Sequence, residues 1–328
     1  MLKKIAAFFC LAGCFQVAFA AEFPSLYYQP ISAFEELDEE EFFYRQSCDE
    51  RDFDYRASES DQLEAYNHIL QMQQDGFFDA DHHLVSRSLN NPYISDDIWQ
   101  HVTPYLIPDD HPAKEALDKI FSSSRALRSV KAMRQAGFSN PVPGYKGMIV
   151  TKHKSIPGYL IKAYLDTTNI PEWLALTHRA IGARYIQNTI DKFGYQGIMK
   201  VPKKWIYPLP AEPSPPQEEG YFRKNFVLVV ENMKILSFAD NEAAYKRLIT
   251  KKILEALYTV LREDKLVDSV YIDNIPFSRD GKIAFVDTEH FNTTTKPLHL
   301  EHLARCFSKS MRAYWLQLCS NGIQNEGK

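Results

Sequence analysis

The chain has 328 residues, of which 45% are hydrophobic and 24% charged, and its formal net charge is −4 at pH 7. This composition is typical of a globular protein and excludes collagen-like, coiled-coil and intrinsically disordered chains. The nearly balanced charge argues against a dedicated nucleic-acid-binding protein, which would usually be clearly basic. The length allows one large domain or two modest ones.

The first 20 residues have the pattern of a secretory signal peptide. Two lysines precede an apolar stretch over 5–19, and Ala18 and Ala20 supply small residues before a cleavage site. Cys14 follows Leu-Ala-Gly, which also resembles the lipobox of bacterial lipoproteins. We therefore expect an exported protein of the periplasm, the cell envelope or the medium, with simple cleavage or a lipid anchor at Cys14. No later apolar run reaches 18 residues, so we expect no membrane span after signal removal.

Three cysteines, Cys48, Cys306 and Cys319, follow the expected signal peptide. An odd number allows at most one internal disulfide, and the sequence does not decide whether Cys306 and Cys319 pair. No Cys-x-x-Cys motif occurs, which removes the usual zinc and thioredoxin-like signatures. Stability must therefore come mainly from a hydrophobic core.

Residue patterns divide the mature chain into three parts and predict an α+β fold. Residues 21–137 are expected to form a mostly helical extension, because apolar residues recur at helical spacing after about residue 59. Residues 138–236 are rich in expected strands, and residues 237–328 are mostly helical around one hairpin. The later expected elements are a hairpin over 148–165, a helix over 172–193, strands at 197–201 and 226–230, a helix over 241–262, a hairpin over 274–286 and a helix over 298–319.

The second hairpin carries the most informative polar residues. Asn274 precedes an apolar segment, an Arg-Asp-Gly turn follows, and Asp287 ends the returning segment. We expect both side chains at one end of the hairpin. Two hard oxygen donors at neighbouring strand ends can bind Mg²⁺ that bridges nucleotide phosphates. A plain β-hairpin with a glycine turn is the alternative.

Two further features lie upstream in chain order. Lys162 lies among apolar residues in an expected strand. It is either a functional lysine on a central strand or a surface lysine on an edge strand. The apolar strand at 226–230 runs into Glu231, Asn232 and Met233, as a buried strand leading into a linker would.

This order of elements and motifs resembles the protein-kinase-like superfamily, including its aminoglycoside and choline kinase branches, over roughly 138–291. The resemblance implies a two-lobed fold with a short C-terminal lobe, and ATP and Mg²⁺ as cofactors. It implies that Lys162 binds the nucleotide phosphates, that the linker at Glu231 and Met233 borders the adenine, and that Asn274 and Asp287 bind the metal.

The sequence also departs from the family's pattern. The family has a His-x-Asp whose Asp stands five residues before the Asn, but here Ser269 occupies that place and Val267 replaces the His. The catalytic base is therefore either Asp268, displaced by one residue, or absent. Glu289 either adds a metal-binding carboxylate or caps the next segment. The helix over 172–193 offers no mid-helix Glu to pair with Lys162.

Two functions from different classes remain open at this point. The first is a nucleotide- and Mg²⁺-dependent phosphotransferase with a divergent catalytic loop, acting on a small molecule or a protein. The second is an inactive pseudokinase that binds a protein partner as a secreted effector or envelope protein. The bacterial periplasm is not expected to hold ATP, which slightly favours the pseudokinase.

A second metal candidate lies near the C-terminus. His299 and His302 are three positions apart with Glu301 between them. A zinc site would need a further ligand from a neighbouring segment, so we interpret these as surface histidines.

Overall fold

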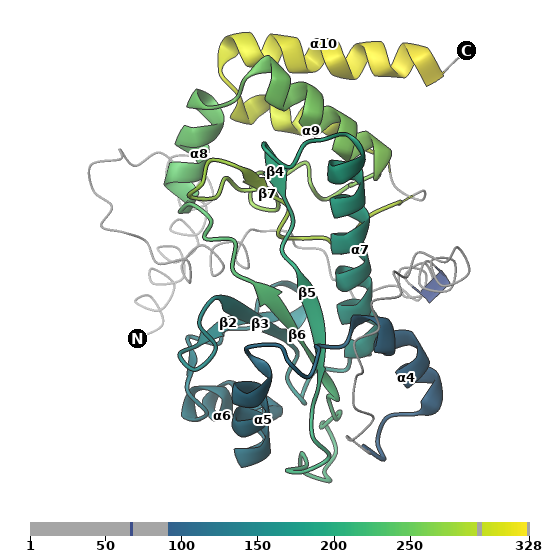
Figure 1. Cartoon of the computed structure of the whole chain (residues 1–328), viewed down its shortest axis with the longest axis vertical. Coiled ribbons are helices and arrows are strands. Elements are labelled where there is room, and N and C mark those ends of the chain that lie inside the picture. Colours follow the sequence, from purple (N-terminus) through teal and green to yellow (C-terminus); the bar gives the residue numbers. More distant parts are fainter. Residues whose placement is uncertain (1–65, 68–90, 294–296, 327–328) are drawn as a thin grey trace, which may run out of the picture. The chain divides into compact units, whose positions relative to one another are not determined.

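A computed structural model describes residues 66–67, 91–293 and 297–326, all within one compact unit, Asp38–Lys328 (Figure 1). The expected signal peptide, Cys14, Cys48 and most of the first half of the helical extension lie outside the described residues. Within the described ranges, no helix has both the length and the apolar character needed to cross a membrane. Cys306 and Cys319 are both free thiols.

The described part of the N-terminal extension is helical, as its spacing predicts. Ser95 and Ser129 cap two of its helices, since each side chain accepts a hydrogen bond from a backbone N–H in the first turn. The elements are α4 (Asp96–Val102), η2 (Thr103–Tyr105), α5 (Lys114–Ser123), η3 (Ala126–Arg128) and α6 (Val130–Gln135).

A five-stranded antiparallel sheet follows, with the strand order β1-β2-β3-β6-β5. The fold is therefore α+β. The apolar strand β6 lies between β3 and β5, which explains why all but its last residue is buried. The strands are β1 (Phe138–Ser139), β2 (Ile149–His153), β3 (Tyr159–Ala163), β5 (Lys204–Pro208) and β6 (Phe226–Glu231).

The two faces of this sheet pack into different hydrophobic clusters because successive side chains alternate between faces. Leu160 and Val230 pack with residues of α7 (Glu172–Lys192), whereas Ile161 and Val229 pack with residues of α5 and α6. Figure 1 shows α7 running alongside β5 toward the pair β4 (Met199–Lys200) and β7 (Ile283–Ala284).

Two expected helices are each broken into two elements. The helix expected over 241–262 is α8 (Phe238–Arg247) followed by α9 (Lys251–Glu263), because Thr250 is extended and caps α9. The helix expected over 298–319 is η5 (Leu300–Cys306) followed by α10 (Lys309–Glu326). Phe307 is extended at this break, and its buried ring packs on Trp315 and Tyr245. Tertiary packing overrides the helical period here.

The hairpin expected at 274–286 is present, although only its second arm is regular. Backbone hydrogen bonds join Val286 N–H to the Asn274 carbonyl at 3.0 Å and Ser278 N–H to the Lys282 carbonyl at 2.8 Å. Gly281 turns the chain with φ of +79°. The returning arm forms β7, which pairs in parallel with β4.

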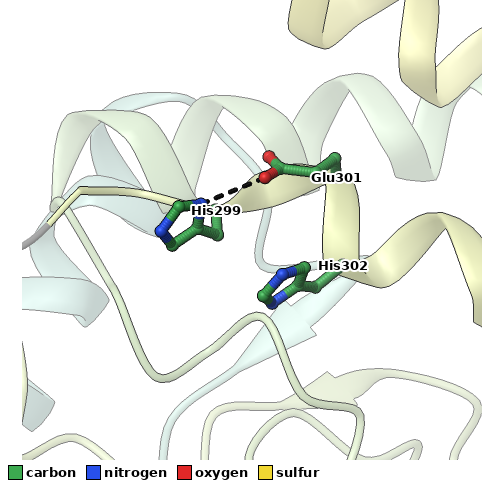
Figure 2. Close-up of side chains that lie close together, drawn as sticks. All are labelled: His299, Glu301 and His302. Carbon is green, nitrogen blue, oxygen red and sulfur yellow. Dashed lines mark hydrogen bonds and ion pairs between the residues drawn. The ribbon is translucent and has the colours of Figure 1, made fainter.

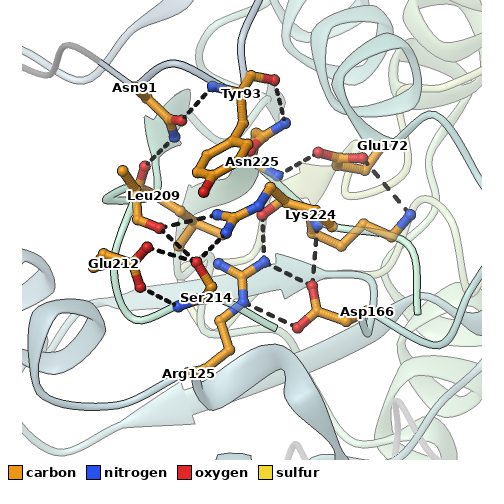
Figure 3. A network of polar contacts seen from close by, with 12 residues as sticks. Asn91, Tyr93, Arg125, Asp166, Glu172, Leu209, Glu212, Ser214, Lys224 and Asn225 are labelled. Carbon is orange, nitrogen blue, oxygen red and sulfur yellow. Dashed lines mark hydrogen bonds and ion pairs between the residues drawn. The ribbon is translucent and has the colours of Figure 1, made fainter. Parts of the chain in front are cut away.

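A buried polar network fixes the chain beside this sheet (Figure 3). Arg125 donates to both carboxylate oxygens of Asp166, at 3.0 and 2.6 Å, and to the Lys224 carbonyl at 2.6 Å. Glu172, at the start of α7, accepts from Asn225 N–H at 2.6 Å. The network therefore ties the segments that follow β3 and precede β6 to one another.

We predict that Asp166→Ala lowers the free energy of unfolding by about 3–5 kcal/mol, because it leaves a buried arginine without its partner. Glu263→Ala is the control, since it breaks an ion pair with Lys192 that is exposed at the surface, where such pairs contribute about 1 kcal/mol or less. Urea denaturation followed by circular dichroism measures both. An equal decrease in the free energy of unfolding for both variants would show that the buried network contributes no more to stability than a surface ion pair.

Candidate functional site

A shallow pocket that is open to solvent lies beside β3, β6 and the chain that follows β6. The three residues that the sequence nominates for nucleotide binding, Lys162, Glu231 and Met233, all line it. Val286, the residue before Asp287, closes the same pocket. The complete lining is Leu160, Lys162, Pro202, Val230, Glu231, Asn232, Met233, Ile235 and Val286.

Lys162, which lines this pocket, has a second lysine close by. Lys162 on β3 and Lys204 on β5 point to the same face of the sheet, since they stand opposite Leu228 and Val230 on the strand between them. Their ammonium groups lie 3.5 and 3.3 Å from the Val286 carbonyl oxygen. Lys162 is therefore not a surface residue on an outer edge, and it is only 7% exposed.

Burial disfavours the charged form of both lysines. Burial lowers the pKa of Lys162 to about 8, although nearby Asp287 acts in the opposite direction. Burial also lowers the pKa of Lys204 well below its usual range, and repulsion by Lys162 adds to this. The free protein thus lacks enough negative charge around these two groups.

Arg179, from the middle of α7, holds the two acidic residues of the site. Its guanidinium donates to the carboxylates of Asp287 and Glu289 through different nitrogens. Between these two acids, the Thr288 hydroxyl donates to the Arg179 carbonyl at 2.6 Å and accepts from Lys204 at 2.6 Å. These ion pairs and hydrogen bonds therefore attach residues 287–289 to α7 and to the sheet.

The basic side chains dominate the electrostatics of both carboxylates. Burial would raise the pKa of Asp287, but Arg179, Lys162 and Lys204 hold it well below its usual range. Burial likewise opposes ionisation of Glu289, yet Arg179 and further basic neighbours lower its pKa to about 2. Both acids are therefore ionised at neutral pH.

The candidate base Asp268 contacts the segment that follows Asp287. Its carboxylate is 3.2 Å from His290 Nε2, and its carbonyl accepts from the Asn274 side-chain amide at 2.7 Å. The Asp268 side chain is 44% exposed, whereas Ser269 is buried. Of the two residues near the family's base position, only Asp268 offers an accessible carboxylate.

The donor set does not fit a resident divalent cation. Asn274 and Asp287 are adjacent through their backbones, with Asp287 N–H 3.5 Å from the Asn274 carbonyl. However, Asp287 is already paired with Arg179, and Lys162 and Lys204 lie close by. A doubly charged cation would add positive charge where basic groups already outnumber carboxylates. The magnesium site at Asn274 and Asp287 stays a prediction that this charge balance disfavours.

The cluster His299, Glu301 and His302 is the other set of metal-ligand side chains close together (Figure 2). One ligand atom from each lies within 4.8 Å of the others, and His299 Nδ1 is 3.0 Å from a Glu301 oxygen. All three side chains are exposed and come from one short segment. Among the residues that the structure describes, no fourth ligand joins this cluster, as a structural zinc site would need.

Sequence reasoning missed Arg179 and Lys204. Arg179 stands three residues after Leu176 and four before Ala183, on the buried face of α7. A cation on the apolar face of an amphipathic helix requires a carboxylate partner, and this was the signal available. Lys204 alternates with the buried Ile206 in the same way on its strand.

Comparisons with known proteins leave the interpretation of this site to its own geometry. No family model, curated protein or solved structure matches the chain. The resemblance to kinase-like proteins therefore depends on the residues and their arrangement alone.

We predict that Gly182→Ala lowers the free energy of unfolding by about 1–3 kcal/mol or more, as overpacking does. An added Cβ would stand 2.0 Å from the Thr288 carbonyl oxygen and 2.8 Å from the Phe291 ring. In Gly197→Ala, the control, the new methyl meets nothing within 4 Å. Thermal unfolding of the two variants measures the difference, and a neutral Gly182→Ala would contradict the close packing of α7 on this segment.

We predict that Lys162→Met stabilises the free protein by about 3 kcal/mol at pH 7, which corresponds to a pKa lowered from 10.5 to about 8. The unfolded chain binds more protons than the folded one between these pH values, so wild-type stability should rise as the pH increases from 8 to 10.5. Lys162→Met should flatten this rise.

The control for this prediction is Lys154→Met, because Lys154 is exposed in the turn between β2 and β3. Denaturant titrations at several pH values give the measurement. A loss of stability in Lys162→Met at pH 7 would show that Lys162 has a favourable partner in the free protein.

Proposed function

We propose that this protein is an exported, kinase-like nucleotide-binding protein without phosphotransfer activity, a pseudokinase whose nucleotide-bound form recognises a protein partner. The observation that carries the proposal is that Lys162, Glu231 and Met233 line the same pocket. The sequence predicts a nucleotide-binding role for these residues from the order of the elements alone, although they lie about 70 positions apart in the chain. Their convergence supports the resemblance.

The pocket offers both apolar and basic groups. Leu160, Val230 and Ile235 provide apolar walls, which suit a flat aromatic base with polar edges. Lys162 also lines the pocket, and its ammonium group and that of Lys204 both lie near the Val286 carbonyl. A base against the apolar walls and phosphates beside the ammonium groups would use both.

The strand order gives independent support. The connection from β3 passes through α7 to β5, and β6 then returns between β3 and β5. This places β6 beside β3, with Lys162 opposite Leu228 and with Glu231, at the start of the linker, opposite Tyr159. The two central strands thus supply both Lys162 and Glu231 to the pocket.

The arrangement of charges favours binding without catalysis. Phosphoryl transfer relies on cations that bridge the phosphates and on a base that positions the nucleophile. Here the two acids that would hold a metal are paired with Arg179, and the Asp268 carboxylate is paired with His290. Neither is free for the catalytic role.

Phosphotransfer is the second candidate function, and one observation favours it. Asp268 is partly exposed, and the Asn274 side chain holds its backbone in place. Release of the His290 contact when substrate binds would leave the Asp268 carboxylate available as a base.

We predict that ATP raises the midpoint of thermal unfolding of the signal-less protein, because a ligand that binds only the folded state stabilises it by about 2.7 kcal/mol at 100 times its Kd. Lys162→Met should lose at least tenfold in affinity, whereas Lys154→Met should bind as the wild type does. No shift at millimolar ATP would rule out the proposed nucleotide site. Phosphate release or transfer that Asp268→Asn abolishes would instead establish the second candidate.

A further inference from the structure

Asp287 and Glu289 share one cation, the Arg179 guanidinium, which is part of the chain and therefore cannot dissociate as a metal ion can. The Arg179 side chain is only 7% exposed, and it contacts both Asp287 and Glu289. An arginine stays charged at any physiological pH, and here the two acids hold its pKa even higher, against the effect of burial. The place between the two carboxylates therefore already contains a permanent positive charge.

Further basic groups surround this ion-pair cluster. Lys162 and Lys204 approach the neighbouring Val286 carbonyl from the sheet. Lys146, from the turn before β2, lies close enough to lower the pKa of Glu289. With Arg179 there are four basic side chains against the two acids, Asp287 and Glu289. Burial disfavours the charged forms of Lys162 and Lys204, and an anion with several negative charges would favour them.

Arg179 also keeps hydrogen-bonding capacity. Two of its nitrogens bind the two carboxylates, while its Nε is buried and has no hydrogen-bond partner. A buried donor without a partner is unfavourable, so an oxygen that reached Nε would satisfy a group that the free protein leaves unpaired. Planar guanidinium groups bind phosphate oxygens well for the same geometric reason that they bind carboxylates.

We propose that the Arg179 guanidinium takes the place of the divalent cation that kinase-like proteins use, so that this site binds the polyphosphate of a nucleotide without metal. The inference rests on the proposed nucleotide-binding function and adds to it the form in which the ligand is recognised. The metal-free nucleotide carries more negative charge than its Mg²⁺ complex, and it meets four basic side chains instead of a paired metal.

The lowered pKa values of Lys162 and Lys204 agree with this inference. Both groups are buried where their charge is unfavourable, and a polyphosphate beside the two ammonium groups would supply a counter-charge. A metal-bound nucleotide would supply less of it.

The test compares ATP binding by isothermal titration calorimetry in EDTA with binding in excess Mg²⁺. We expect ATP to bind in EDTA at least as tightly as in Mg²⁺. Binding only in Mg²⁺ would overturn the inference and leave the proposed nucleotide site intact. An absence of binding in both buffers would overturn the proposed function itself, so the two failures are distinguishable.

Variants of Arg179 test its part directly. Arg179→Gln removes the charge and should weaken ATP binding in EDTA at least tenfold, while Mg²⁺ should now restore binding through the released carboxylates. Arg179→Lys keeps the charge and should retain most of the metal-free affinity. Arg184→Gln is the control, since Arg184 is exposed on the same helix and contacts the Pro104 carbonyl.

Folding of each variant is checked by circular dichroism before titration. If Arg179→Gln does not fold, Arg179→Lys and the Mg²⁺ dependence of the wild type still decide the question. Metal-free binding that is unchanged in a folded Arg179→Gln variant would overturn the role of Arg179.

Discussion

The ion pairs from Arg179 to Asp287 and Glu289 join parts of the chain that are more than 100 positions apart. They attach the segment after the second hairpin to the middle of α7, and α7 in turn packs against β5 and β6. Because all three side chains are largely removed from water, each depends on the others for compensation of its charge. The position of Val286, and with it one wall of the pocket, follows from this attachment.

The sheet adds basic groups to the same place for a geometric reason. Side chains two positions apart share a face, so Lys162 follows Leu160 and Lys204 precedes Ile206 toward α7. Each lysine replaces an apolar residue that would have packed better. A protein that keeps such groups buried in a site loses stability in the free state, and a bound anion would return part of it. This is the usual relation between a preorganised site and the stability of its scaffold.

Sequence patterns predicted the elements wherever the apolar period is strong and continuous. The helix over 172–193, the two strands of the hairpin over 148–165 and the strand before Glu231 agree with α7, β2, β3 and β6 to within two or three residues. The breaks after Arg247 and at Phe307 were missed, because an apolar stripe continues across both. At Phe307 the extended conformation places a large ring in the core, and a local pattern does not record that preference.

By itself, the sequence determined the α+β class, the order of the elements and the candidacy of Lys162, Glu231 and Met233, because each depends on residues that are close together in the chain. Only the tertiary structure decided that these three share a pocket and that Arg179 and Lys204 belong beside it. It also decided the charge balance that favours an anion over a metal at Asp287. Pairing of charges across 108 positions depends on how α7 packs on the sheet, and no local spacing encodes that distance.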